Sequence, residues 1–403
     1  MMKKIKLGEI LDVKRGTSLS GKYYKTEGDY IRLTLGNFNY PSSGWKENKS
    51  KDNLYYDGPI TPEYIMSKGD IITPLTEQVR GLLGNTATVP EDNLYIQSGD
   101  IGKVIPHSDV LYGRFAYYLI SSRIVKKQLD ACAQQTKIRH TSPDKIKNCA
   151  AFIPDKISEQ IKIASILDAI NSKIELNNRI NDNLQQLARM IYNQQFKSSS
   201  VLYSDGETCL FCNFIKNITT GLNPRNHFKL TNNGYSYITV KNLTISGELN
   251  FNDCDHVDSN AATLIQNRAN VSAGDILFSS IAPLGRCHLV LEEPKDWVIN
   301  ESVFCIKPIT RILQYYLYFY LTSKEFVKKA ESSSTGSIFN GIRISTLNNM
   351  KLKKPNEFEL ISFNEKVEPL LKQIENNNVE NLKLNSLRDF LLPLLMNGQA
   401  TID

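Results

Sequence analysis

Six loop segments of this 403-residue chain carry side chains that can contact the bases or phosphates of a nucleic acid. Arginine, lysine, asparagine and glutamine side chains can read base edges, and lysine and arginine also bind phosphates. The candidates before position 200 are Lys22, Tyr23, Lys25, Gln78, Arg80, Lys137, Arg139 and His140. Those after position 200 are Arg225, His227, Lys229, Arg286, Asn340 and Arg343. Any single one can equally be a solvated surface group, so the clusters carry more weight than their members.

Aromatic and glycine residues accompany these clusters. The rings of Tyr23 and Tyr24 can stack on a base or pack inside their loop, and we expect packing. Gly81, Gly84 and Gly285 allow tight turns next to a nucleic-acid backbone, because glycine tolerates positive φ angles. The loops of the two halves differ in sequence, so any two sites that they read should also differ.

Motifs for catalysis or metal binding are incomplete throughout the sequence. It contains no Walker A loop, no dinucleotide-binding glycine fingerprint and no HExxH. The string nearest to the Asp/Asn-Pro-Pro-Tyr motif of adenine methyltransferases is Asn223-Pro224-Arg225, which lacks the second proline and the aromatic residue. Cys209 and Cys212 have metal-ligand spacing but no second pair, so we expect buried thiols there. We therefore predict no catalytic residue, no metal and no cofactor on this chain.

The totals fit a protein of the cytoplasm. The seven cysteines are scattered and odd in number, which favours reduced thiols. No apolar run is long enough to cross a bilayer, so we expect no membrane contact. Residues 1–155 contain 22 basic and 17 acidic side chains, net +5, and residues 197–355 contain 17 and 13, net +4. Residues 356–403 contain 4 and 8, net −4. Basic globular segments suit a polyanion such as DNA, although a surplus of this size is weak evidence alone.

The two halves of the chain repeat one plan at an offset near 200 residues. "MSKGDIIT" at 66–73 matches "VSAGDILF" at 271–278, and "YLISSRIVKK" at 118–127 matches "YLTSKEFVKK" at 320–329. Each half has strand-like segments, then an amphipathic helix predicted over 112–130 or 311–330, then a long helix. A repeat of this length represents whole domains rather than solenoid units.

Two long helices are predicted over 156–196 and 356–398, each with an apolar stripe at spacings of three and four. The residues expected to pair the helices are Ile163, Leu167, Ile170, Ile174, Asn177, Leu184, Leu187, Ile191, Val367, Leu370, Ile374, Asn377, Leu384, Leu387 and Leu391. Equal stripes should pack on each other, and an antiparallel pair would hold the two globular domains apart. A helix of about 38 residues spans about 57 Å.

Asparagines interrupt both stripes at mid-length. They are Asn177, Asn178 and Asn181 in the first helix and Asn377, Asn378 and Asn381 in the second. They form either a solvated break or a set of facing amides that fixes the register of the pair. Their equivalent positions in the two helices favour pairing.

The segment "IPDKISEQIKIASILDAINSKIELNNRI" resembles the central motif of the specificity subunits of type I restriction-modification enzymes. The matching residues are Pro154, Glu159-Gln160, Ile163, Ile166-Leu167, Ile170, Ile174-Glu175 and Asn177. "LRDFLLPLLMNGQ" at 387–399 is similar to the closing motif of the family. The segments at the starts of the two domains, "LGEILDVKRGTS" and "FIKNITTGLNP", also resemble the family. The second copy departs from the central motif, with Glu359-Leu360 in place of Glu-Gln.

The resemblance implies an α+β fold. Two similar mixed α/β target-recognition domains, 1–155 and 197–355, would be separated by two long antiparallel spacer helices, 156–196 and 356–398, packed as a coiled coil. Each domain would read one half of an asymmetric, bipartite site in double-stranded DNA. The helices would bind two modification subunits, which carry S-adenosylmethionine and methylate adenine at N6. Two restriction subunits, which use ATP and Mg²⁺, can join such a complex.

Two other classes of function are compatible with parts of the sequence. A stand-alone DNA methyltransferase would transfer methyl groups as a purified chain, and the missing motifs argue against it. A coiled-coil scaffold that binds only protein would show no DNA sequence preference, and the basic globular segments argue against it.

Overall fold

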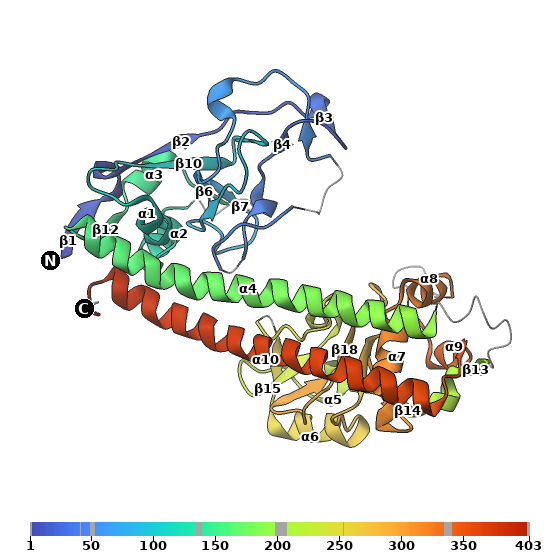
Figure 1. Ribbon diagram of the computed structural model, residues 1–403. Coiled ribbons are helices and arrows are strands. Elements are labelled where there is room, and N and C mark those ends of the chain that lie inside the picture. The colour runs from blue at the N-terminus through green and yellow to red at the C-terminus, as the bar shows by residue number, and fades with distance from the viewer. Residues whose placement is uncertain are drawn as a thin grey trace. The chain divides into compact units, whose positions relative to one another are not determined.

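The computed structural model describes residues 2–40, 42–48, 53–133, 139–197, 208–252, 254–333 and 341–400. The chain divides into two compact units. The first unit comprises Met1–Leu176 with Glu380–Asp403, and the second unit comprises Asn177–Val379. Each long helix therefore contributes part of its length to each unit (Figure 1).

The described residues of the first half of the chain form short strands and short helices, followed by the long helix α4. In chain order they are β1 (Met2–Lys6), β2 (Leu11–Arg15), β3 (Tyr24–Lys25), β4 (Ile31–Arg32), β5 (Tyr55–Tyr56), β6 (Ile71–Pro74), β7 (Thr76–Glu77), β8 (Ala87–Thr88), β9 (Tyr95–Ile96), β10 (Ile101–Pro106), α1 (Gly113–Ile120), α2 (Arg123–Cys132), β11 (Arg139–His140), α3 (Pro143–Lys147), β12 (Ala150–Pro154) and α4 (Ile157–Phe196).

The second half of the chain has a matching series. It consists of β13 (Thr208–Leu210), β14 (Ile215–Thr220), α5 (Pro224–His227), β15 (Tyr235–Ile238), β16 (Asp255–Val257), α6 (Ser259–Arg268), β17 (Ile276–Ser279), β18 (Cys287–Leu289), β19 (Trp297–Ile299), β20 (Val303–Pro308), α7 (Gln314–Leu321), α8 (Lys324–Ser332), α9 (Ile344–Asn348), β21 (Lys351–Lys353) and α10 (Glu357–Met396).

Both units use the same sheets. The order β2-β10-β6-β8 in the first unit corresponds to β14-β20-β17-β18 in the second, and the pair β1-β12 corresponds to β13-β21. A further sheet in each unit contains one parallel pair, β4 with β9 and β15 with β19. The internal repeat predicted from sequence is thus a repeat of topology. Helix α6 is an addition of the second unit, since the only helix among the described residues 53–67 of the first unit is a short 3-10 turn, Pro62–Tyr64, before its "KGDI" segment.

The repeated "GDI" segments owe their similarity to a capped turn and an ion pair. The Asp70 carboxylate accepts a hydrogen bond from the Ser67 amide at 2.9 Å and pairs with Lys103 Nζ at 2.6 Å. Asp275 accepts from the Ser272 amide at 2.8 Å and pairs with Lys307. In each unit the turn is thereby tied to the neighbouring strand of the four-stranded sheet.

The single helices predicted over 112–130 and 311–330 are each two helices, so that prediction is wrong in detail. α1 ends at Ile120, and Ser122 caps α2, because its hydroxyl accepts from the Val125 amide. Ser323 caps α8 in the same way, through the Phe326 amide at 3.2 Å. Serine competes with the helical backbone for hydrogen bonds and so favours a cap over a helix interior.

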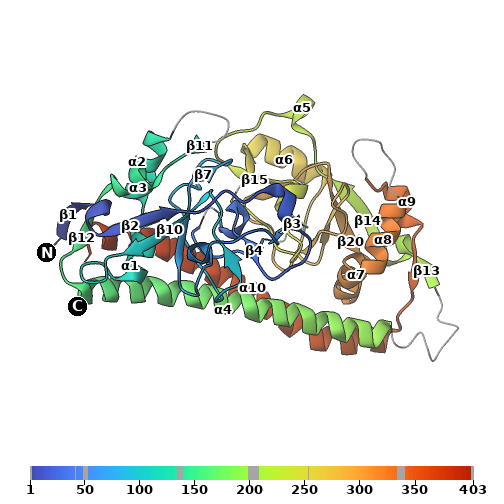
Figure 2. The ribbon, with the colours of Figure 1, turned by 90° about the horizontal axis from the view of Figure 1, so that it is seen from above.

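The two long helices, α4 and α10, pack side by side (Figures 1 and 2), as predicted. In the first unit, Lys173 of α4 lies 3.1 Å from Glu380 of α10. In the second unit, the rings of Phe196 and Phe363 lie 5.1 Å apart, edge to face. As residue numbers rise along α4 from Lys173 to Phe196, those of their partners fall along α10 from Glu380 to Phe363, which makes the pair antiparallel. The fold class is α+β, with two mixed units and a packed helix pair, in agreement with the prediction.

Most residues of the predicted stripes lie between the helices and the rest of each unit. Ile163, Leu167, Ile170, Asn177, Val367, Ile374 and Asn377 are buried, and Ile174, Leu184, Ile191, Leu370, Leu384 and Leu391 are half-buried. Leu187 and Leu387 are instead exposed, at 42% and 45%. At position 188 the buried residue is Ala188, because after Leu184 a step of four rather than three stays on the inner face. The assignment of Leu187 and Leu387 to helix pairing is therefore wrong.

The mid-helix asparagines form the amide contact rather than a solvated break. Asn181 Nδ2 donates to Asn378 Oδ1 at 2.7 Å, and Asn377 Nδ2 donates to Asn181 Oδ1 at 2.8 Å. Both Asn181 and Asn377 are buried. Because buried amides need partners, sliding one helix past the other would leave them unsatisfied, and this favours a single register.

The family motif has a clear structural role in the first unit. Gln160 is fully buried, and its amide nitrogen donates to the carbonyl oxygens of Val110 and Pro154, each at 3.0 Å. Its amide oxygen accepts from the Tyr112 amide at 2.8 Å. Gln160 therefore anchors α4 to the domain before it. In the second copy Leu360 is also buried, so apolar packing replaces these hydrogen bonds.

No helix of the described residues is long and apolar enough to cross a membrane.

The half-buried Lys126 predicts how the stability of the first unit depends on pH. Burial, together with the nearby Arg388, lowers the pKa of Lys126 to about 8, and its ammonium group donates to Asn85 Oδ1. Between pH 8 and 10 the unfolded chain binds a proton at this lysine that the folded chain has lost, so stability should rise. We expect a gain on the order of 1–2 kcal/mol in the free energy of unfolding across this window. Denaturation at several pH values should show the rise in the wild type and a flatter profile in Lys126→Met.

Candidate nucleic-acid interface

The structure brings two of the predicted clusters of the first unit together on paired strands. β7 and β11 lie next to each other (Figure 2). They are antiparallel, with Glu77 opposite Arg139 and Thr76 opposite His140. The segments "EQVRG" and "IRH", about 60 residues apart in sequence, thus share one edge of the unit. His140 and Gln78 are exposed.

Arg139 is committed to partners inside the unit. Its Nη1 donates to Glu77 Oε1 at 2.7 Å and to Asp130 Oδ1 at 2.6 Å, and its Nη2 donates to the Asp130 carbonyl oxygen at 2.6 Å. Its side chain is only 16% exposed. Hydrogen bonds from Arg80 and then from Arg139 hold the pKa of the Asp130 carboxyl well below its usual range. This network gives Arg139 a structural role within the unit, so its presence in the predicted cluster does not require a contact with a base.

The loop after β7 has a fixed backbone. The Glu77 carboxylate accepts from the amides of Gly81 and Leu83, both at 3.0 Å. The Tyr40 hydroxyl donates to the Arg80 carbonyl oxygen at 2.8 Å. The Arg80 side chain is 77% exposed, and its guanidinium meets Asp130 in two hydrogen bonds of 3.1 and 2.6 Å. The loop therefore holds one shape while its side chains face solvent.

A second cluster of the first unit lies on the sheet that contains β3 and β5. Lys22 is exposed, with its Nζ 4.5 Å from the centre of the Tyr23 ring. The Tyr23 ring packs edge to face against Tyr56 at 5.9 Å, which confirms the expectation of packing. Lys25 is exposed and lies 3.9 Å from the Asp57 carboxylate. Its positive charge is therefore only loosely paired.

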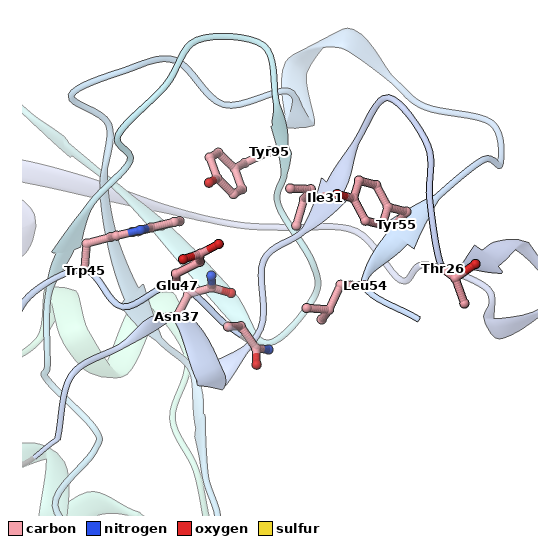
Figure 3. A pocket seen from close by; sticks show the side chains of 9 residues that line it. Thr26, Ile31, Asn37, Trp45, Glu47, Leu54, Tyr55 and Tyr95 are labelled. Atoms are coloured by element: carbon pink, nitrogen blue, oxygen red, sulfur yellow. The ribbon is translucent and has the colours of Figure 1, made fainter. Parts of the chain in front are cut away.

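A pocket of about 570 Å³ opens beside this second cluster (Figure 3). No motif in the sequence indicates it. Its lining residues are Thr26, Ile31, Asn37, Trp45, Glu47, Asn48, Leu54, Tyr55 and Tyr95. The rings of Trp45 and Tyr95 meet edge to face at 4.9 Å. The aromatic residues come from separate segments, so only the recurrence of tyrosine and tryptophan near residues 45–55 could have indicated a pocket.

The second unit repeats the first cluster in modified form. An isolated bridge joins Ile281 to Gly341, and the Ile342 amide donates to the Ser280 carbonyl oxygen at 2.8 Å. Arg343 is exposed, directly before α9. Arg286 is half-buried, and its Nη1 donates to the Leu243 carbonyl oxygen at 3.2 Å. Of the two arginines, Arg343 is the more available to a partner.

The remaining cluster of the second unit is displayed around the short helix α5. Asn223 caps this helix by accepting from the Arg225 amide at 2.9 Å, and its amide nitrogen donates to Glu301 at 2.6 Å. Arg225, His227 and Lys229 are all exposed. The cap thus fixes a turn that presents three basic or imidazole side chains to solvent. Lys137 and Asn340, also predicted, lie outside the described residues.

No cluster of three or more His, Cys, Asp or Glu side chains able to hold a metal occurs in the described part of the chain. Cys209 is half-buried and Cys212 is exposed, so the expectation of two buried thiols there is wrong. Cys209 lies in β13, at the edge of a two-stranded sheet, where burial is incomplete.

These features define a class of protein with two similar α+β units, exposed basic clusters in each unit and a packed pair of long helices. Residues 1–186 and 215–386 match the family described as "Type I restriction modification DNA specificity domain". The chain belongs to this family, and it is a DNA specificity subunit of a type I restriction-modification system. Specificity subunits are the non-catalytic subunits of these enzymes and bind no cofactor themselves. This confirms the prediction that this chain is a non-catalytic subunit of a larger enzyme.

Individual relatives are distant in sequence but similar in extent. The specificity subunit of the HindI enzyme of Haemophilus influenzae is 22% identical over 417 residues, covering 85% of this chain and 89% of the relative. The specificity subunit of the MjaIX enzyme of Methanocaldococcus jannaschii is 21% identical, covering 74% and 72%. The crystal structure of the S subunit from M. genitalium is similar in fold, with a TM-score of 0.59, 16% identity and coverage of 98% and 96%.

Proposed function

We propose that this chain recognises an asymmetric, bipartite site in double-stranded DNA, with one half read by each recognition domain, 1–155 and 197–355. One observation carries the proposal. The two units share their sheet order, yet the exposed side chains of equivalent loops differ, with Gln78 and Arg80 before β8 in one unit and Ala282 and Pro283 before β18 in the other. Similar frames with different contact residues suit two different half-sites, because base identity is read by side-chain type.

The helix pair offers surfaces for partner subunits. Large apolar side chains are exposed at three positions that recur at an offset of 200 residues. The first unit exposes Ile161, Leu387 and Phe390, and the second unit exposes Ile361, Leu187 and Met190. Large apolar side chains that stay exposed at equivalent positions of both units are candidates for protein interfaces. We propose that each set docks one modification subunit, so that two bind.

The chemistry belongs to those partners in this proposal. Modification subunits would carry S-adenosylmethionine and methylate adenine at N6, and two restriction subunits would add ATP- and Mg²⁺-dependent action. The antiparallel helices would act as a spacer that sets the distance between the half-sites.

The test is to map N6-methyladenine in DNA from cells that express this chain with its modification partner. We expect one bipartite motif with two different halves and a constant spacer. Exchange of residues 1–155 for another recognition domain should change one half only. A symmetric motif, or a change in both halves, would contradict the proposal.

Exposed arginines of the second unit should contribute to DNA affinity. Arg225→Ala or Arg343→Ala should weaken binding by about 1–3 kcal/mol if a base contact is lost. If only a phosphate contact is lost, the slope of affinity against salt concentration should fall by about one. Fluorescence anisotropy with target DNA at several salt concentrations separates the two cases. Lys366→Ala removes one positive charge from an exposed position on α10 and serves as the control. Equal affinities for all three variants and the wild type would place both arginines outside the interface.

A further inference from the structure

The loop between Glu77 and Gly84 combines a buried charged anchor with an exposed tip. Glu77 is 1% exposed, and its carboxylate holds two amides of the loop that follows it. Gly81 and Gly84 have φ angles of 101° and 82°, a region that other residues rarely adopt. The backbone thus makes two turns that the sequence permits only because glycine stands at both.

Arg139 makes this anchor possible. A buried carboxylate without a countercharge is costly, and the Arg139 guanidinium lies 2.7 Å from the Glu77 oxygen. The same guanidinium reaches Asp130, which in turn pairs with Arg80 of the loop. The Glu77–Arg139 pair and Asp130 together form a clamp around residues 78–83.

The exposed part of the clamped loop is residues 78–81, and we refer to its first two residues, Gln78 and Val79, as the tip. Both are exposed, and Val79 is 58% exposed although it is apolar. Their neighbour Arg80 already directs its guanidinium to Asp130. A glutamine amide can both donate to and accept from the edge of adenine, and an apolar side chain can contact the methyl group of thymine. The pair therefore has the chemistry to read an A·T base pair in the major groove.

The second unit does not build this clamp at the equivalent position. Counted from the repeated aspartates, Asp70 and Asp275, Ala282 stands where the first unit has Glu77. Among the residues that the structure describes there, the adjoining contact is the bridge between Ile281 and Gly341. The clamp of the first unit should therefore affect only the half-site that the first unit reads.

We infer that Gln78 and Val79 read an A·T pair in the half-site of the first recognition domain, and that Glu77 and Arg139 are positioning residues that hold this tip in shape. The inference rests on the proposed function. A preformed loop avoids the cost of ordering its residues on binding, so it discriminates between bases more sharply than a mobile one.

The experiment compares methylation maps of the full complex containing wild-type chain, Gln78→Ala, Val79→Ala, Glu77→Gln or Arg139→Lys. In the two tip variants we expect discrimination at one A·T position to fall by about 5- to 150-fold, with the other half-site unchanged. The two clamp variants should relax the same position while the melting temperature of the purified chain stays near that of the wild type. Gln266→Ala removes an exposed glutamine from α6 of the second unit and is the matched control.

Each outcome separates the inference from the proposed function. If wild-type complex yields a bipartite motif and the tip variants leave it unchanged, the inference fails and the proposed function stands. If the clamp variants lower methylation at both halves equally and reduce the melting temperature, Glu77 and Arg139 have a purely structural role and the positioning part fails. A wild-type map without a bipartite motif refutes the proposed function itself.

Discussion

Replacing Phe363 with alanine is expected to lower the free energy of unfolding of the second unit by about 3–5 kcal/mol. Phe363 lies in the second turn of α10 and is fully buried. Its ring contacts those of Tyr192 and Phe196 from α4, at 6.0 and 5.1 Å, and that of Phe319 from α7, at 5.9 Å. The substitution removes apolar contact area and leaves a cavity that three rigid rings fill poorly.

Chemical denaturation followed by circular dichroism measures this loss. Phe358→Ala is the matched control, because Phe358 lies one turn earlier on the same helix and is 85% exposed. It should change the free energy of unfolding by no more than about 0.5 kcal/mol. Equal effects of the two substitutions would mean that the helix pair is not held by this aromatic cluster.

The second large effect is expected at the exposed apolar positions of the helices. Leu387→Asp combined with Phe390→Asp should prevent one modification subunit from binding, because each carboxylate would lose water in an apolar interface. The expected loss of affinity at that surface is on the order of 2–4 kcal/mol. Stability should change little, because both side chains are exposed. Leu187→Asp with Met190→Asp should have the same effect at the equivalent surface of the second unit.

Light scattering coupled to size-exclusion chromatography gives the number of modification subunits per chain. We expect two for the wild type, one for either double variant and none for the quadruple variant. Lys366→Asp, at an exposed position of α10 outside both sets, should retain two. Two subunits bound to the quadruple variant would show that docking uses a different surface.

Local sequence patterns indicated the helices well because helical periodicity records which face is covered. The buried positions Ile163, Leu167 and Val367 follow from spacings of three and four, and the asparagine contact follows from equivalent interruptions in both stripes. The same reasoning failed at Leu187 and at the helix predicted over 112–130. At Leu187 the reason is that spacings of three and four both fit a helix face. At Ser122 the sequence pattern continues the helix, whereas in the structure the Ser122 hydroxyl caps α2.

Composition and motif spacing predicted a chain without a catalytic site, but they did not identify the partners of individual charged side chains. The sequence lacked complete catalytic motifs, and membership in the family agrees with a non-catalytic subunit. It also suggested Arg139 and Arg80 as equals, whereas the structure commits Arg139 to Glu77 and leaves the Arg80 side chain largely in solvent. The partners of a side chain are often distant in sequence, and such pairings cannot be read from a single sequence.

The sequence alone determined the repeated plan, the helix pair and the family, because these depend on residue types at regular intervals along the chain. Only the tertiary structure decided which charged groups face solvent. Strand pairing across about 60 residues places Glu77 beside Arg139, and burial then fixes their ion pair. Such long-range neighbours arise from sheet topology, which no local spacing encodes.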